Sequence, residues 1–236
     1  MQEMLYHHNF AVIDKLTVSD KTSAVNRLMI LLIAGGTFIY SHFAEAHPHS
    51  FIDMDATFVS DKQMLTGMKM VWTMDEITSA DLLYDAENAK SDSEIWKKLA
   101  AEVMANVLGQ HYFTDIYRDG SPVKYKNLPT EYHLARKGHQ AVLTFVMPLA
   151  EPQPLAGKPF IISTYDPTYF VDMTYADNKS VRLSPEMEKI CKLTLFTPNP
   201  NASLQAYALS LDKSDSPGED MELGKQFAQR ITVQCQ

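Results

Sequence analysis

Several common functional motifs are missing from this sequence of 236 residues, which has only nine glycines and two cysteines. It contains no glycine-rich phosphate-binding loop, no G-x-S-x-G nucleophile motif and no H-E-x-x-H metalloprotease motif. Basic residues are outnumbered, because 21 Lys and Arg face 29 Asp and Glu, for a net charge of −8. That charge argues against nucleic acid or an anionic membrane surface as a partner. Hydrolase and nucleotide-binding functions therefore have no specific support.

Extended apolar runs are also scarce, and the one that stands out is LMILLIAGGTFIY at residues 28–40. It is shorter than the roughly 20 residues that a membrane-spanning helix needs. Arg27 precedes it, and the small residues Ala44 and Ala46 stand at positions −3 and −1 of the expected cleavage site, a pattern typical of secretion signals. We predict that residues 1–46 are a cleaved signal peptide with a long polar leader, and that the mature, periplasmic protein begins at His47. The alternative is an uncleaved N-terminal anchor. No later stretch is apolar enough to span a membrane, so the processed protein is not expected to be integral to one.

Both cysteines, Cys191 and Cys235, lie in the part of the chain that is expected to be exported. An even number of cysteines in an oxidising compartment predicts one disulfide. Closing a loop of this length stabilises a fold by roughly 4 kcal/mol in the chain-entropy model. The alternative is a pair of thiolate metal ligands, although the two residues lack the close spacing of such motifs.

Hydrophobic periodicity predicts an α+β protein with antiparallel sheets. Residues 51–59 and 64–74 alternate apolar and polar side chains, as half-buried strands do. Two consecutive helices should follow, one capped by Asp75 and one that begins at the capping box Ser91-x-x-Glu94 and ends at Gly109. Later segments again resemble strands, beginning with a hairpin whose first strand is expected at residues 112–118.

A proline-rich stretch provides the best internal boundary of the mature chain. Prolines at 148, 152, 154 and 159 suggest a stiff connector there. We therefore predict an α+β subdomain at residues 47–150, which holds the two helices, and a β-rich, disulfide-tied subdomain at residues 151–236.

The expected new N-terminus, His47-Pro48-His49, is the strongest candidate metal site. Cleavage before His47 would leave three nitrogen donors within three residues, namely the α-amine and two imidazoles, which suit zinc, copper, nickel and iron. Pro48 has no backbone N–H to offer, so coordination would depend on side chains. In an extended chain Asp53 shares the face of His49 and is a candidate ligand or orienting group for it. The alternative is a frayed polar terminus.

A second cluster spans residues 165–172, where Asp166 begins a turn before Pro167. Asp166, together with Tyr165, Tyr169 and Asp172, offers oxygen ligands or hydrogen bonds to a histidine, and we include Asp166 among the candidate metal ligands. The alternative is an Asx turn with packed aromatic side chains.

Taken in order, these motifs resemble one family of bacterial proteins. They are Ala46-His47-Pro48-His49-x-Phe51-Ile52-Asp53, Trp72-Thr73-x-Asp75-Glu76, Tyr112-Phe113-Thr114, Pro148-Leu149, Tyr165-Asp166-Pro167-Thr168-Tyr169 and Phe227-Ala228-x-x-Ile231-Thr232-Val233-x-Cys235. The family consists of periplasmic proteins labelled as a periplasmic component of an ABC-type transport system, associated with nickel/cobalt-type permeases and zinc uptake. The resemblance implies export, metal handling and a membrane permease as partner. Residues 85–92 depart from the calcium-like loop of many relatives, so calcium is not implied.

Together, the residues and the resemblance predict a metal-binding accessory protein and not an enzyme. Its expected ligand is a divalent transition metal, zinc or nickel, which it would pass to an uptake permease for zinc, nickel or cobalt. One alternative is a structural or interaction module of the cell envelope that binds no metal. Another is a copper-dependent oxidative enzyme with an N-terminal histidine brace, which would need His111, His133 or His139 close to His47.

Overall fold

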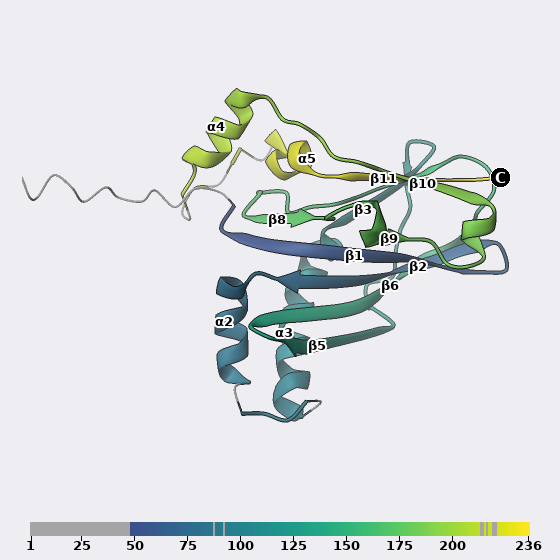
Figure 1. Ribbon diagram of the computed structural model, residues 1–236. Coiled ribbons are helices and arrows are strands. Elements are labelled where there is room, and N and C mark those ends of the chain that lie inside the picture. Colours follow the sequence, from purple (N-terminus) through teal and green to yellow (C-terminus); the bar gives the residue numbers. More distant parts are fainter. Residues whose placement is uncertain (1–47, 87, 92, 213–214, 216, 219–220) are drawn as a thin grey trace, which may run out of the picture. The chain divides into compact units, whose positions relative to one another are not determined.

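The computed structural model describes residues 48–236 apart from 87, 92, 213–214, 216 and 219–220 (Figure 1). The expected signal peptide, residues 1–46, and the candidate ligand His47 lie outside the described residues. Ala44–Gln236 forms one compact unit.

The first sheet has the strand order β5-β6-β2-β1-β8, with β9 also paired to β1. Its pairs β1–β2, β2–β6 and β5–β6 are antiparallel, whereas β8 and β9 run parallel to β1. The strands predicted near residues 51–59 and 64–74 are confirmed as β1 and β2. The members of this sheet are β1 Ser50–Asp61, β2 Met64–Met74, β5 Glu131–Lys137, β6 Gln140–Pro154, β8 Val171–Thr174 and β9 Val181–Arg182.

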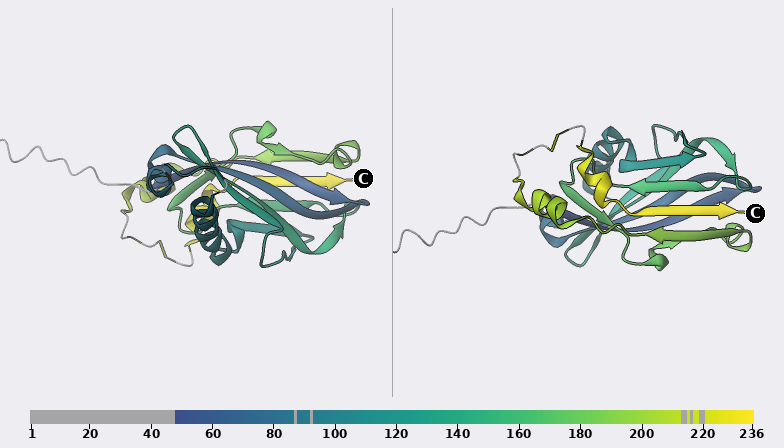
Figure 2. Two further views of the ribbon diagram at one scale, coloured as in Figure 1. Left: turned by 90° about the horizontal axis from the view of Figure 1, so that it is seen from below. Right: turned by 90° about the horizontal axis from the view of Figure 1, so that it is seen from above.

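The second sheet is antiparallel throughout and has the order β10-β11-β7-β3-β4. The C-terminal strand β11 is an interior strand of this sheet, and Figure 2 shows it alongside its neighbours. Its strands are β3 Thr114–Arg118, β4 Ser121–Pro122, β7 Phe160–Thr164, β10 Cys191–Phe196 and β11 Arg230–Cys235. Each sheet therefore contains strands from both sides of residue 150, and the division into 47–150 and 151–236 stays a sequence-based prediction.

Two consecutive helices, α2 (Glu76–Asp85) and α3 (Glu94–Gly109), confirm the expected helical segment. Asp75 caps α2, as predicted, by accepting hydrogen bonds from two backbone amides. The N-cap of α3 is Ser93, without a side-chain cap bond, and not Ser91. Shorter helices follow at α4 (Ala202–Ser210) and α5 (Leu223–Phe227). No helix in the described part of the chain is both long enough and apolar enough to cross a membrane.

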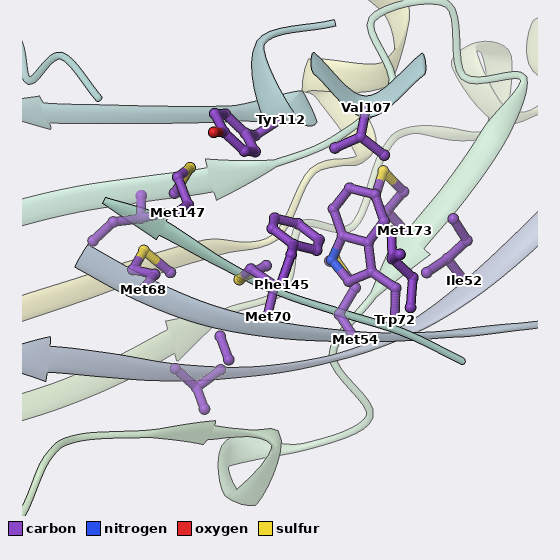
Figure 3. Close-up of a cluster of buried hydrophobic side chains, with 14 of the residues drawn as sticks. Ile52, Met54, Met68, Met70, Trp72, Val107, Tyr112, Phe145, Met147 and Met173 are labelled. Atoms are coloured by element: carbon purple, nitrogen blue, oxygen red, sulfur yellow. The ribbon is translucent and has the colours of Figure 1, made fainter. Parts of the chain in front are cut away.

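The main core lies between the inner faces of the sheets and helix α3, and methionine is prominent in it. Trp72 packs edge-on against Phe145 with ring centroids 5.0 Å apart, and both side chains are fully buried. Figure 3 shows methionines from several strands around this pair. They include Met54, Met68, Met70, Met147 and Met173. The long unbranched methionine side chains fill the irregular space around the two rings.

The proline-rich stretch is not the connector that the sequence suggests, because β6 continues through it to Pro154. Its pairing with β2 shifts between Leu65, opposite Gln153, and Gly67, opposite Pro148. This large bulge accommodates prolines that cannot donate to a regular ladder. Gly67 is required at the shift, since a Cβ there would lie 2.6 Å from the Met147 carbonyl oxygen.

Three consecutive residues after α3 adopt left-handed backbone conformations. His111, Tyr112 and Phe113 have φ values of 50°, 57° and 52°, and such conformations cost about 1–2 kcal/mol each in non-glycine residues. The Tyr125 hydroxyl secures the turn with its single proton, which the carbonyls of His111 and Thr114 both lie close enough to accept. The first strand of the hairpin therefore begins at Thr114 and not at residue 112.

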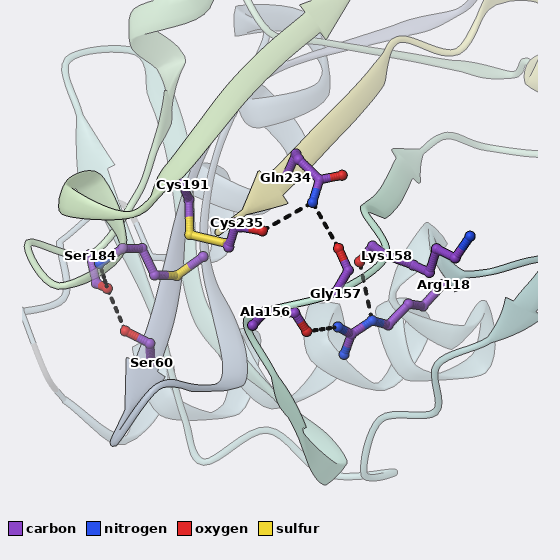
Figure 4. Close-up of a disulfide and its surroundings, with 10 residues drawn as sticks. Ser60, Arg118, Ala156, Gly157, Lys158, Ser184, Cys191, Gln234 and Cys235 are labelled. Atoms are coloured by element: carbon purple, nitrogen blue, oxygen red, sulfur yellow. Dashed lines mark hydrogen bonds between the residues drawn. A yellow bond between two sulfur atoms is a disulfide. The ribbon is translucent and has the colours of Figure 1, made fainter.

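The predicted disulfide is confirmed, and it joins the paired strands β10 and β11 (Figure 4). Cys191 and Cys235 are direct cross-strand partners with Cα atoms 3.9 Å apart. The adjacent Gln234 amide donates to the Gly157 carbonyl over 2.8 Å. The end of the chain is thus tied covalently to β10 and by hydrogen bonding to the loop before β7.

Candidate metal site at the start of strand β1

The backbone at His49 is held by the loop before β8. The amides of His49 and Ser50 both donate to the Phe170 carbonyl, over 2.9 and 3.3 Å, and the His49 ring lies 4.9 Å from the Phe170 ring. From Ser50 onward β1 pairs in parallel with β8, with Phe51 beside Asp172. A chain that enters the fold at His49 is therefore held in an extended conformation against residues about 120 positions later in the sequence.

The alternation of β1 directs Phe51 and Asp53 away from the core, whereas Nε2 of His49, just before the strand, is buried. Ser50 and Ile52 between them are buried, while Phe51 and Asp53 are exposed and His49 is partly exposed. Because parallel partners present their side chains on the same face, Asp172 shares this outward face beside Phe51. Asp172 thus lies diagonally from His49 on one side and from Asp53 on the other. This arrangement places Asp53 and Asp172 on one surface, with His49 immediately before the start of the strand.

Asp75 fixes the neighbouring backbone through its carboxylate. Its Oδ2 accepts from the Phe51 amide at 2.9 Å and from the Thr78 hydroxyl at 2.6 Å, and its Oδ1 accepts from the Ile77 amide at 2.9 Å. Burial alone would raise the pKa of Asp75, but these hydrogen bonds, together with that from the Thr78 amide, outweigh burial and lower it. Asp75 stays ionised and links β1 to the first turn of α2.

The Asp166 carboxylate is engaged within its own loop. It accepts from the Thr168 amide and hydroxyl and from the Val171 amide at 2.9–3.0 Å, and the residue is only 7% exposed. Through these bonds the carboxylate organises the turn that carries Phe170. The geometry therefore gives Asp166 a positioning role, in agreement with the Asx-turn alternative.

The fold alters the protonation of Asp172. Burial and, secondarily, the negative charge of Asp53 raise the pKa of Asp172. Two carboxylates that repel each other at a surface favour a bound cation, because a cation removes the repulsion. Burial and, secondarily, the negative charge of Asp172 also raise the pKa of Tyr169, in the adjacent loop, to about 12.

We expect Asp172→Asn to stabilise the metal-free protein at neutral pH. A carboxyl whose pKa is raised on folding binds its proton more tightly in the folded state, so its contribution to stability falls as pH rises from the unfolded to the folded pKa. At pH 7 the ionised side chain is therefore destabilising, and the asparagine removes that cost. Below about pH 3 both states are protonated, so the gain should vanish.

Urea denaturation in the presence of EDTA at pH 3, 5 and 7 would measure this difference. Asp61→Asn, which changes an exposed carboxylate at the other end of β1, is the matched control. A gain of the same size at pH 3 and pH 7, or an equal gain in the control, would contradict the argument.

Among the described residues, no group of three His, Cys, Asp or Glu side chains is close enough to hold a metal ion. A site here would have to include the imidazole and α-amine of His47, which lies outside those residues. His133, a candidate for the copper brace, lies on β5, three strands from β1, at about 4.8 Å per strand. The geometry places it away from His49.

The parallel pairing that adds Asp172 to this surface carries no sequence signal of its own. The residue appears in the 165–172 cluster, but nothing in that cluster indicates its alignment with Phe51. Exposed Phe170 and Phe51, which flank the histidine, were also not foreseen as parts of the site.

Comparison with known proteins defines the family of the chain. The profile of a family described as "Protein of unknown function (DUF1007)" matches residues 31–235. The chain belongs to this family. A relative from Haemophilus influenzae, described as an uncharacterized protein, is 42% identical over 192 residues, which cover 81% of this chain and 92% of the relative. The match of the family profile begins within the apolar run at residues 28–40 and ends at Cys235.

Proposed function

We propose that this protein is a periplasmic, transition-metal-binding accessory protein that passes zinc or nickel to a membrane permease. The observation that carries the proposal is the outward face at the start of β1, where Asp172 and Asp53 share a surface close to His49; among the described residues these three do not suffice to hold a metal ion, so the site depends on His47. His47, immediately before this segment, would add an imidazole and, after signal cleavage, an α-amine. The protein would act by binding and transfer, without catalysis.

The donor set suits a borderline divalent ion. Imidazole nitrogen binds zinc, nickel and cobalt well, and carboxylate oxygen can complete the coordination. Repulsion between Asp172 and Asp53 makes the surface attractive to a cation before any ligand is added. Because the donors lie on an exposed strand and not in a closed cage, bound metal would remain accessible to a partner, as a transfer role requires.

Exposed apolar side chains around the histidine support contact with another protein. Phe51 is 51% exposed, Phe170 37% and Ile77, in the first turn of α2, 84%. Asp75 joins the backbone of Phe51 to that of Ile77, so the two side chains belong to one end of the sheet. Exposed apolar groups that gather beside polar ligands are typical of interaction sites. The disulfide supports an oxidising, periplasmic location.

Zinc should stabilise the exported protein, and replacement of His49 should remove the effect. At a free zinc concentration about 100 times the dissociation constant, binding to the folded state alone adds about 2.7 kcal/mol to the free energy of unfolding. Thermal and urea denaturation of protein whose N-terminal residue has been verified as His47 would measure this gain, with nickel and cobalt in parallel.

The informative variants are His49→Ala and the double variant His47→Ala/His49→Ala, with His139→Ala as the control. His139 is an exposed imidazole beside Gly138 in the β5–β6 turn. Zinc stabilisation that is equal in all four proteins would refute the proposed site. Protein that begins at any residue other than His47 would remove the α-amine from the ligand set.

An interaction module without metal is the second candidate, and the exposed Phe51, Phe170 and Ile77 are the observation that favours it. This function predicts that zinc leaves stability unchanged while Phe51→Ser and Ile77→Ser weaken capture of the protein by detergent-solubilised permease. The same denaturation series therefore separates the two functions.

A further inference from the structure

The outer face of the second sheet carries a hollow that is unrelated to the histidine surface. Its volume is about 380 Å³, within the range of about 300–1,000 Å³ that is typical of small-molecule sites. Strands β3, β7 and β11 form its floor, and residues of α5 and of the segment after β10 line its wall. The side chains important for recognition are Asp115, Tyr117, Tyr165, Phe196, Lys225 and Arg230.

The pairing register sets opposite charges on the two sides of this floor. Asp115 of β3 is paired with Ser163 of β7, and the register of β7 with β11, continued by one residue, places Arg230 on the other side of Ser163. Arg230 is in turn the partner of Phe196 on β10. The row across β3, β7, β11 and β10 thus consists of Asp115, Ser163, Arg230 and Phe196. The Asp115 carboxylate and the Arg230 guanidinium are two strands apart in it.

The charged groups do not neutralise each other across the row. No ion pair joins Asp115 to Arg230 or Lys225 in the part of the chain that the structure describes. The Arg230 guanidinium lies over the Phe196 ring, 5.0 Å from its centroid, and Lys225 pairs with Glu222 at 2.9 Å. Cationic donors are therefore held on one side of the hollow and a carboxylate on the other.

The acidic side is organised by a tyrosine. The Tyr165 hydroxyl donates to Asp115 Oδ2 over 2.7 Å, and burial, followed by the hydrogen bond to Asp115, raises the pKa of Tyr165. Tyr165 therefore remains a neutral donor, fixes the carboxylate and leaves Oδ1 for another donor. Tyr117 and Phe196, which are 37% and 54% exposed, provide apolar surface beside these groups.

We propose that this hollow binds a small zwitterion of the amino-acid or short-peptide class. The ammonium group of the ligand would donate to Asp115, and its carboxylate would accept from Arg230 and Lys225. Its side chain would rest on Tyr117 and Phe196. A ligand with only a positive charge would meet the Arg230 guanidinium with no carboxylate to offer it, and a ligand with only a negative charge would meet Asp115. The geometry therefore selects a molecule that carries both charges.

Three related compounds test the requirement for both charges. L-Phenylalanine has both groups, 2-phenylethylamine lacks the carboxylate and 3-phenylpropionate lacks the ammonium group. Isothermal titration calorimetry on the full processed protein in EDTA should give an affinity for L-phenylalanine at least about tenfold higher than for either analogue, since each lost charge-assisted bond is worth about one such factor.

The variants assign each charge to its partner. Asp115→Asn should weaken the binding of L-phenylalanine about tenfold but not that of 3-phenylpropionate. Arg230→Gln should also weaken the binding of L-phenylalanine about tenfold, but not that of 2-phenylethylamine. Asp119→Asn, an exposed change on the β3–β4 turn, is the control, and circular dichroism establishes that each variant is folded. No saturable binding of L-phenylalanine, equal binding of either analogue, or insensitivity to both variants would overturn the proposal.

Discussion

Gly224→Ala is expected to lower the free energy of unfolding by about 3 kcal/mol, because the added methyl group has no space. A Cβ at Gly224 would lie 1.7 Å from the Asp166 carbonyl oxygen and 2.8 Å from its carbonyl carbon. Both are backbone atoms, so no side-chain rotation relieves the clash. The Gly224 amide donates to the Pro167 carbonyl over 3.0 Å, which holds the start of α5 against the loop.

The loop that this substitution would displace is the one that positions Phe170 beside His49. We therefore expect the variant to lose zinc stabilisation as well as intrinsic stability. Urea denaturation would measure the first effect and the zinc-induced shift in Tm the second. Gly109→Ala is the matched control: a Cβ there would have no neighbour within 4 Å, and alanine favours a helix by about 1 kcal/mol over glycine. Equal destabilisation by both substitutions would show that the close approach at Gly224 does not matter.

Removal of the disulfide is expected to have the largest effect on stability. Cys191→Ala/Cys235→Ala should lower the free energy of unfolding by about 4 kcal/mol in the chain-entropy model, because the bridge closes a loop with a sequence separation of 44 residues. Alanine is suitable because Cys235 is only 4% exposed. Guanidinium denaturation monitored by circular dichroism would give the difference.

Reductant provides the control for this experiment. Wild-type protein in excess dithiothreitol should unfold at the denaturant concentration at which the double variant does, whereas the double variant should not respond to dithiothreitol. A double variant as stable as the oxidised wild type would contradict the expectation. It would show that the pairing of β10 with β11 suffices without the bridge.

The elements with a local signal were predicted well from the sequence. Alternating side chains in β1 and β2, the Asp75 cap and the apolar stripes of α3 depend on neighbours a few residues away, so their periodicity is visible in the chain itself. The cysteine pair was predictable because two cysteines allow one intramolecular bridge. The α+β class followed from the order of these elements.

The features that were missed depend on long-range contacts. The parallel pairing of β1 with β8, which brings Asp172 beside Phe51, joins segments that have no common pattern. Prolines at 148–154 indicated a break, yet a bulge opposite Gly67 keeps them in β6. Asp166 stays a sequence-based prediction of a metal ligand, and what the sequence did not indicate is that Thr168 and Val171 donate to its carboxylate in the fold. Residue type alone does not distinguish a carboxylate that binds a ligand from one that orders a loop.

The placement of β11 has a consequence for biogenesis. These residues are synthesised after both strands that hydrogen-bond to them, β10 and β7. Until β11 emerges, β10 lacks the strand with which it pairs, and the Cys191 thiol lacks its disulfide partner Cys235. The second sheet therefore cannot be completed until β11 has been synthesised. Oxidation of the thiol pair would then lock the finished pairing of β10 with β11.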